Sequence, residues 1–317
     1  MSQKPLVVQT EHLDAEPAAW LGERCELVAC PVESDKFRSL APRIEGLVVR
    51  TYTRVDQSLL EALPRLRVVG RGGVGLENID VPACLRRGVK VVHTPEANRQ
   101  AVVEYVFALL MDAMRPRVFL DRSLSEGDWK RARRELTGRR QFNELTFGIL
   151  GFGRIGRHVA RIAAALGCRV IYHDLLSMPP DWRSGAIPVT RERLLRDADV
   201  LSLHVDARDE NRRMVDLAFL EQLKHDVIIV NTARGMLVDN DAMAAFMIKH
   251  PQALALLDVH HPEPIPDDYP LLHVENVHLS PHLAASTESA QRLMSWVVSD
   301  VWRVLTGERP EFAAPEP

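Results

Sequence analysis

Two series of short apolar runs, with a helix-length stretch between successive runs, constrain the fold of this chain more than any other feature. Runs of three to five apolar, largely β-branched residues are typical of the buried strands of a parallel sheet. Helices between parallel strands return the chain by right-handed crossovers. We therefore expect an α/β fold with two doubly wound parallel sheets. The expected strands are 6–8, 27–29, 46–49, 67–69 and 90–92 in the first series and 147–150, 169–172, 200–204, 227–230 and 254–257 in the second.

The length of 317 residues suits two domains. A helical apolar period over 98–114 separates the two series, and a last helix is expected at 286–305. Because the chain ends soon after that helix, we expect it to return to the first domain. The predicted domains are 1–97 plus 287–317, and 98–286. The charged stretch 115–144 is interpreted as a solvated connecting arm.

Composition excludes several classes of protein. Forty basic and 43 acidic residues leave a net charge of −3, which gives no general reason to bind nucleic acid. No apolar run approaches the roughly 20 residues of a membrane span, and no signal-peptide core is recognised, so a cytoplasmic protein is expected. The cysteines are scattered, without metal-ligand spacing, and predict neither a metal site nor a disulfide framework. They are Cys25, Cys30, Cys84 and Cys168.

A glycine-rich turn follows the first strand of the second series. Gly151-Phe-Gly-Arg-Ile-Gly156 joins that strand to a helix at 157–166. In a dinucleotide fingerprint the first glycine permits the tight turn, Gly153 lets the backbone approach a pyrophosphate, and the third allows close packing of helix on strand. Asp174 ends the next strand, where a carboxylate accepts from ribose hydroxyls and repels a 2′-phosphate. The pattern predicts NAD as the cofactor, in preference to NADP.

Three polar side chains follow later strands of the second series. Arg234 can grip a carboxylate and polarise a carbonyl. His282 can transfer a proton near neutral pH, and Glu263 can orient that imidazole. Because the carboxyl ends of parallel strands share one edge, where open α/β sheets bind ligands, we expect the three to converge there.

Several motifs resemble those of the D-isomer-specific 2-hydroxyacid dehydrogenases. The motifs are Gly73-Val-Gly-Leu-Glu-Asn78-Ile-Asp80, His93-Thr-Pro-Glu-Ala-Asn98, the glycine-rich turn, Asn231-Thr-Ala-Arg-Gly235 and Pro281-His282. The resemblance runs nearly end to end. The chain departs from the family's pattern at Glu96, Asp206 and Ala284-Ala285.

The resemblance implies a Rossmann NAD-binding domain inserted in a flavodoxin-like substrate domain. It makes Arg234, Glu263 and His282 catalytic. It implies backbone contacts to the substrate carboxylate near Gly72, Gly73 and Val74. Arg50 and Arg71 end strands of the first series and are further candidates for substrate contacts. The implied cofactor contacts, besides Gly151, Gly153, Gly156 and Asp174, are Arg154, Ile155, His204, Val205, Ala233 and Asp258.

The expected activity is reversible hydride transfer between NADH and a small 2-oxo acid. Arg50 and Arg71 would suit a phosphorylated substrate such as phosphohydroxypyruvate, as in phosphoglycerate dehydrogenases, and glyoxylate or hydroxypyruvate is the alternative. Two alternative functions are an NAD-sensing corepressor, which binds the cofactor without turnover, and a formate dehydrogenase, which pairs its histidine with Gln instead of Glu. The resemblance also implies a homodimer whose contacts involve the helix from Asn98 and the arm after Arg115.

Overall fold

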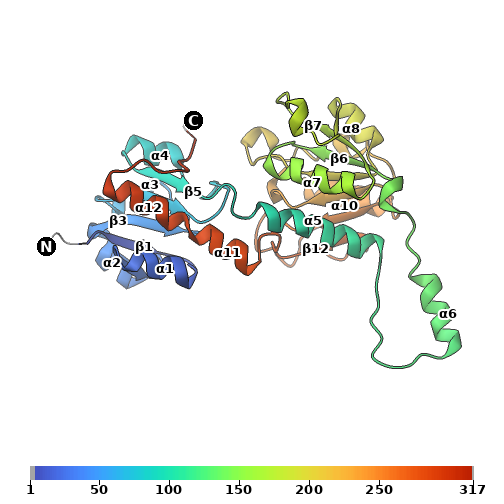
Figure 1. Ribbon diagram of the computed structural model, residues 1–317, viewed down its shortest axis with the longest axis horizontal. Coiled ribbons are helices and arrows are strands. Elements are labelled where there is room, and N and C mark those ends of the chain that lie inside the picture. The colour runs from blue at the N-terminus through green and yellow to red at the C-terminus, as the bar shows by residue number, and fades with distance from the viewer. Residues whose placement is uncertain (1–3, 316–317) are drawn as a thin grey trace. The chain divides into compact units, whose positions relative to one another are not determined.

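A computed structural model describes residues 4–315, which form two compact α/β units (Figure 1). Unit 1 comprises the residues up to Gln100 and those from Ala285 onward, and unit 2 is Ala101–Ala284. No helix in the described part of the chain is both long and apolar enough to cross a membrane.

Unit 1 contains a five-stranded parallel sheet in the order β2-β1-β3-β4-β5. This is the flavodoxin-like order of a doubly wound sheet, which confirms the predicted fold class for this unit. Its strands are β1 (Leu6–Gln9), β2 (Glu26–Ala29), β3 (Ile44–Val49), β4 (Val68–Arg71) and β5 (Lys90–His93). Its helices are α1 (Ala15–Gly22), α2 (Asp35–Leu40), the 3-10 turn η1 (Ala41–Arg43), α3 (Gln57–Ala62), α4 (Val81–Arg86), α11 (Glu288–Ser295) and α12 (Val297–Thr306).

The two faces of this sheet form separate apolar cores. The C-terminal helix α12 covers one face, where Val297 and Val301 pack with Val48 and Val68. A Cβ at Gly70 would overlap Val301, so a glycine in β4 lets the helix lie close to the sheet. The opposite core lies among α2, α3 and α4.

Unit 2 contains a seven-stranded parallel sheet in the order β12-β11-β10-β9-β6-β7-β8. The strand order reverses beside β6, as in a Rossmann fold, so the second expected sheet is also confirmed. The strands are β6 (Thr146–Leu150), β7 (Arg169–His173), β8 (Ile187–Pro188), β9 (Val200–Leu203), β10 (Ile228–Asn231), β11 (Leu254–Leu257) and β12 (Val277–Leu279).

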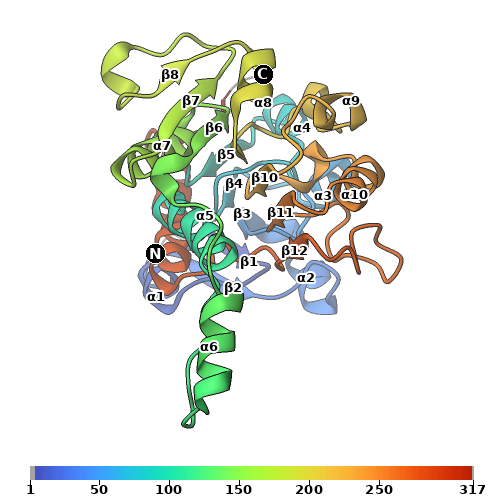
Figure 2. The same ribbon diagram turned by 90° about the vertical axis from the view of Figure 1, so that its right-hand side faces the viewer.

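Helices cover both faces of the second sheet (Figure 2). Val106 of α5 and Val159 of α7 belong to one core, and Leu194 of α8 and Phe246 of α10 belong to the other. The α-helices are α5 (Arg99–Met114), α6 (Glu126–Glu135), α7 (Arg154–Ala165), α8 (Arg191–Asp197), α9 (Leu217–Leu220) and α10 (Asn240–Lys249). The 3-10 turns are η2 (Phe142–Glu144), η3 (Pro180–Trp182), η4 (Asp209–Asn211) and η5 (Gly235–Leu237).

The arm after α5 contains a helix that was not expected. Helix α6 begins after Ser125, whose side chain accepts the N–H of Asp128 at 3.1 Å, and none of its residues is buried. It stands away from the sheet of unit 2 (Figures 1 and 2). The interpretation of 115–144 as a solvated arm is correct, and ten of its residues form this regular helix.

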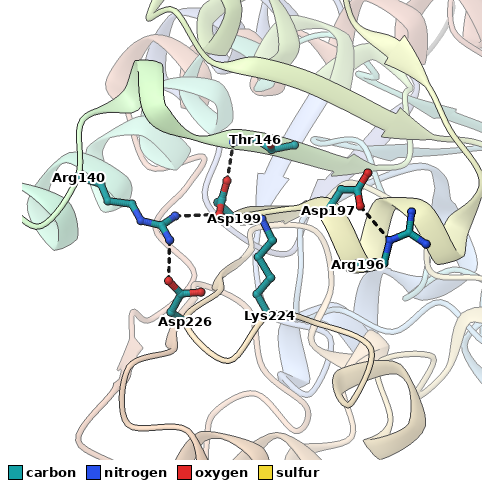
Figure 3. Close-up of polar contacts among 7 residues, drawn as sticks. All are labelled: Arg140, Thr146, Arg196, Asp197, Asp199, Lys224 and Asp226. Carbon is teal, nitrogen blue, oxygen red and sulfur yellow. Dashed lines mark hydrogen bonds and ion pairs between the residues drawn. The ribbon is translucent and has the colours of Figure 1, made fainter.

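A network of charged groups fastens the end of this arm to the sheet (Figure 3). The Arg140 guanidinium contacts Asp199 at 2.8 Å and Asp226 at 2.6 Å, and Lys224 contacts Asp199 at 2.9 Å. Asp199 also accepts the N–H of Thr146, the first residue of β6, at 2.8 Å. The network therefore lies at the amino ends of the strands, opposite the edge where ligands are expected.

Two further expectations need correction. The last helix, expected over 286–305, is interrupted at Trp296 and forms α11 and α12. Strands β8 and β12 were not predicted, because the first has only two residues, both exposed, and the second has one buried residue, Val277.

Candidate active site

The glycine-rich turn lies at the strand reversal of unit 2, between β6 and α7. Gly151 has a φ of +91°, and a Cβ there would lie 2.5 Å from the carbonyl oxygen of His204. A Cβ at Gly156 would overlap the backbone of Gly151, whereas one at Gly153 would meet nothing within 4 Å. Gly151 and Gly156 thus make the turn compact, and Gly153 leaves the start of a 12-residue helix open. This arrangement fits a pyrophosphate at the helix N-terminus.

Asp174 lies beside this turn. One carboxylate oxygen accepts the N–H of Phe152 at 2.6 Å, and the other accepts the N–H of Leu176 at 2.8 Å. A carboxylate has about four lone-pair sites, so two of them stay available for ribose hydroxyls. Leu175 and Leu176 are 79% and 70% exposed, and neither offers a cation to a 2′-phosphate.

The remaining cofactor candidates share this edge of the sheet. Arg154 and Ile155 begin α7, and each of the others follows the carboxyl end of a neighbouring strand: His204 and Val205 follow β9, Ala233 follows β10 and Asp258 follows β11. His204 is in contact with Ser202, whose Oγ lies 2.9 Å from Nε2. Burial lowers the pKa of His204 to about 4, so its ring is neutral at physiological pH.

Glu263 and His282 form the central pair of the site. Oε2 of Glu263 lies 2.8 Å from Nδ1 of His282, and Oε1 accepts the backbone N–H of His260 at 2.7 Å. Burial raises the pKa of Glu263, but the hydrogen bonds with His282 and His260 outweigh it and hold the pKa below its ordinary value. The carboxylate is therefore charged, and it orients an imidazole whose side chain is 40% exposed.

Arg234 lies in the loop after β10, next to the strand that precedes Glu263. Asn231 fixes this loop, because its side chain accepts the N–H of Ala233 at 3.0 Å and donates to the carbonyl of Arg234 at 2.9 Å. A Cβ at Gly235 would overlap the backbone of His260, so the loops after β10 and β11 are in direct contact. The three predicted catalytic residues therefore come from adjacent loops at one sheet edge.

Asp258 holds the loop that carries His282, a role that the sequence did not reveal. Its fully buried carboxylate accepts from Ser280 Oγ at 2.7 Å, Leu283 N–H at 2.8 Å and Ala284 N–H at 2.9 Å. Its carbonyl accepts the N–H of His282 at 2.9 Å. These bonds stabilise His282 at a φ of +55°, a conformation that L residues rarely adopt. The sequence signal for this role was an acidic residue directly after a predicted strand.

The five candidate substrate residues lie together in unit 1, at the carboxyl ends of β3 and β4. A Cβ at Gly72 would lie 2.8 Å from Cδ of Arg50, and one at Gly73 would overlap the guanidinium of Arg71. Arg71 also donates to the carbonyl of Gly72 at 3.1 Å. The glycines before Val74 thus give both arginine side chains room beside the backbone. Among residues 4–315, no cluster of His, Cys, Asp or Glu could hold a metal ion.

Comparison with known proteins identifies the family of both units. Residues 107–284 match the family model described as D-isomer specific 2-hydroxyacid dehydrogenase, NAD binding domain. The glyoxylate reductase of Korarchaeum cryptofilum is 39% identical over 97% of this chain and 95% of its own length. The D-3-phosphoglycerate dehydrogenase of Mycobacterium tuberculosis is 38% identical over 96% of this chain. This chain spans only 57% of that relative's length.

Solved structures support the same relationship over the whole fold. A glyoxylate reductase from Paecilomyes thermophila is 27% identical, with a TM-score of 0.84 over 99% of both chains. Together with the model match over more than half of the residues, these similarities show that the protein belongs to the D-isomer-specific 2-hydroxyacid dehydrogenase family.

Proposed function

We propose that this chain is an NAD-dependent D-2-hydroxyacid dehydrogenase that reversibly interconverts a small 2-oxo acid and its 2-hydroxy acid. The observation that carries the proposal is the 2.8 Å contact between Glu263 and His282 at the ligand edge of the NAD-binding domain. A carboxylate that orients an imidazole is an arrangement suited to proton transfer.

Each catalytic candidate has a distinct role in this proposal. NADH, when bound, supplies the hydride. His282 donates a proton to the carbonyl oxygen of the 2-oxo acid, and it accepts that proton in the reverse direction. Arg234 binds the developing negative charge on the oxygen, and Glu263 keeps Nδ1 of His282 engaged so that Nε2 faces the reaction.

Unit 2 holds the cofactor and unit 1 binds the acid in this proposal. The glycine-rich turn binds the pyrophosphate. Asp174 accepts hydrogen bonds from the ribose hydroxyls and selects NAD over NADP. The rest of the cofactor site is lined by Arg154, Ile155, His204, Val205, Ala233 and Asp258. Arg50, Arg71 and the backbone from Gly72 to Val74 bind the carboxylate or a second anionic group of the substrate.

Two substrate classes follow from the relatives' names and from the arginines of unit 1. D-3-Phosphoglycerate dehydrogenase is the name of several relatives, and glyoxylate reductase and hydroxypyruvate reductase are the names of others. Two guanidinium groups suit phosphohydroxypyruvate, whereas a smaller acid needs only one.

The arm supports a homodimer. Four of its large apolar side chains are exposed, and contact with a second copy of the chain would remove them from water. They are Val118 at 58%, Phe119 at 86%, Leu120 at 51% and Trp129 at 51%.

Because the four cysteines are free and buried, we also place the protein in the reducing cytoplasm.

A panel assay tests the proposal. Loss of NADH absorbance is followed with phosphohydroxypyruvate, hydroxypyruvate and glyoxylate, and NADPH replaces NADH in a parallel series. We expect turnover of at least one acid with NADH, and the best substrate decides between the two classes. NADH binding without turnover of any acid would instead favour a binding protein such as the corepressors.

A further inference from the structure

The loop after β3 directs consecutive backbone N–H groups at one carboxylate. Glu11 follows β1, and because β1 and β3 are neighbouring parallel strands, it lies at the same sheet edge as this loop. All four donors are within 3.1 Å of its oxygens: Arg50 and Thr53 bind Oε1 at 3.0 and 2.9 Å, and Thr51 and Tyr52 bind Oε2 at 2.9 and 3.1 Å. One side chain thus satisfies every N–H of residues 50–53.

The carbonyl side of the same loop is held by Asn78. Its amide nitrogen donates to the carbonyls of Arg50 and Thr53, at 3.1 and 2.7 Å. A contact of 2.6 Å between the hydroxyls of Thr10 and Thr53 adds a third attachment. The loop is therefore fixed on both sides by side chains outside it.

Fixing this loop fixes the base of the Arg50 side chain. Nη2 of Arg50 donates to Oε1 of Gln291 at 2.6 Å, and the aliphatic stem lies against Gly72. Nε and Nη1 are inaccessible to solvent and have no hydrogen-bond partner among the described residues. Arg50 as a whole is only partly buried, and a guanidinium with unused N–H groups is suited to a planar carboxylate or a phosphate oxygen.

The charge of Glu11 also favours the charged form of this arginine. Burial raises the pKa of Glu11, but its backbone hydrogen bonds outweigh burial and hold the pKa below the ordinary value. Burial lowers the pKa of Arg50, and the nearby Glu11 charge opposes that shift. Removal of the carboxylate would therefore loosen the loop and remove a charge that offsets the burial of the Arg50 guanidinium.

We propose that Glu11 is a positioning residue that sets substrate affinity by holding the Arg50 loop. The inference rests on the proposed function, in which Arg50 binds the acidic substrate. Glu11 is not expected to contact the substrate, the cofactor or the reacting atoms. Its effect should therefore appear in the KM for the 2-oxo acid and not in cofactor binding.

Glu11→Gln is the informative substitution, because its amide nitrogen would face two N–H donors where a carboxylate oxygen now accepts. We expect the KM for the best 2-oxo acid to rise about tenfold, while kcat and the Kd for NADH stay within a factor of about two. Glu33→Gln, a neutralisation at an exposed position of the same unit, is the matched control and should leave KM unchanged.

Hydrogen exchange supplies a readout that does not depend on turnover. The amides of residues 51–53 should exchange faster in Glu11→Gln than in the wild type or the control. If that variant fails to fold, Glu11→Asp replaces it, because the shorter side chain cannot reach all the donors and should give the same changes to a smaller degree.

An unchanged exchange rate, or faster exchange with an unchanged KM, would overturn the role of Glu11. If the wild-type chain turns over no 2-oxo acid, the proposed function fails. In that case the exchange rates still decide whether Glu11 holds the loop, and Arg50 loses its assigned ligand.

Discussion

The side chains of Glu263 and His282, 19 residues apart in sequence, meet at 2.8 Å although they follow different strands. Glu263 follows β11, and His282 follows β12. The contact depends on the loop bonds of Asp258 and on the backbone N–H of His260, so the site is fixed by residues that carry no proton in the proposed reaction. The rigidity of these loops explains how an exposed histidine keeps one orientation.

Glu263→Gln should lower kcat/KM by about 10²-fold, the upper range for the loss of a group that orients a functional histidine. The amide keeps the size of the side chain but removes its charge, so the effect should fall on kcat and alter the pH profile of turnover. Steady-state kinetics across pH measure it. Asp268→Asn, at an exposed position of the same segment, should have no effect. Equal kinetics in the two variants would contradict the orienting role.

Asp174→Ser should weaken NADH binding about tenfold and narrow the preference for NADH over NADPH. The variant removes a charge that repels a 2′-phosphate and also the acceptor of the Phe152 N–H. Fluorescence titration with both cofactors measures the change, with Asp181→Ser, at an exposed position, as the control. An unchanged ratio of the two affinities would remove Asp174 from cofactor selection.

The sequence could predict the strands well because burial on both faces forces apolar runs. At the carboxyl-terminal end, nine of the ten expected strands finish within one residue of the observed strand, and 67–69 stops two residues before Arg71; at the other end, 46–49 begins two residues after Ile44. Helix α6 was missed because it has no apolar face, although Ser125 and Asp128 have the spacing of a capped helix start. The short exposed strand β8 left no apolar pattern to detect.

Site residues could be predicted only where a local sequence motif indicates their chemical role. The glycines of the turn and the residues after each strand could be chosen because parallel strands place their carboxyl ends together. Glu11 and Asp258 could not be given their structural roles, since their partners lie 39 to 42 and 22 to 26 residues away. Long-range capping of this kind leaves no periodic signal in a single sequence.

Phe119→Asp should convert the proposed dimer to a monomer. The side chain is 86% exposed in the isolated chain, so a carboxylate costs little there, whereas its burial at an interface would leave an unpaired charge. Sedimentation velocity of the wild type and variant measures the change. Ile248→Asp alters a residue of α10 that is 70% exposed and should leave the assembly intact. A monomeric wild type would contradict the proposal.

Asp199→Asn should destabilise the protein by about 2 kcal/mol at neutral pH, because a buried acceptor of charged donors is replaced by an amide that faces Arg140 and Lys224. Burial raises the pKa of Asp199, but the Thr146 N–H, Lys224 and Arg140 outweigh it and hold the pKa below its ordinary value. A group whose folded-state pKa is lowered stabilises the fold at pH values above its ordinary pKa. This stabilisation is lost as the pH falls through the folded-state pKa.

The difference in unfolding free energy between wild type and Asp199→Asn should therefore be constant above pH 5 or so, about one unit over the ordinary carboxyl pKa, and should shrink in acid. Urea unfolding of both proteins over a pH series measures it. Asp181→Asn, which removes an exposed charge, should show no such dependence. A difference that stays constant into acid would mean that the charge of Asp199 does not stabilise the fold, and that the Arg140 network fastens the arm by geometry alone.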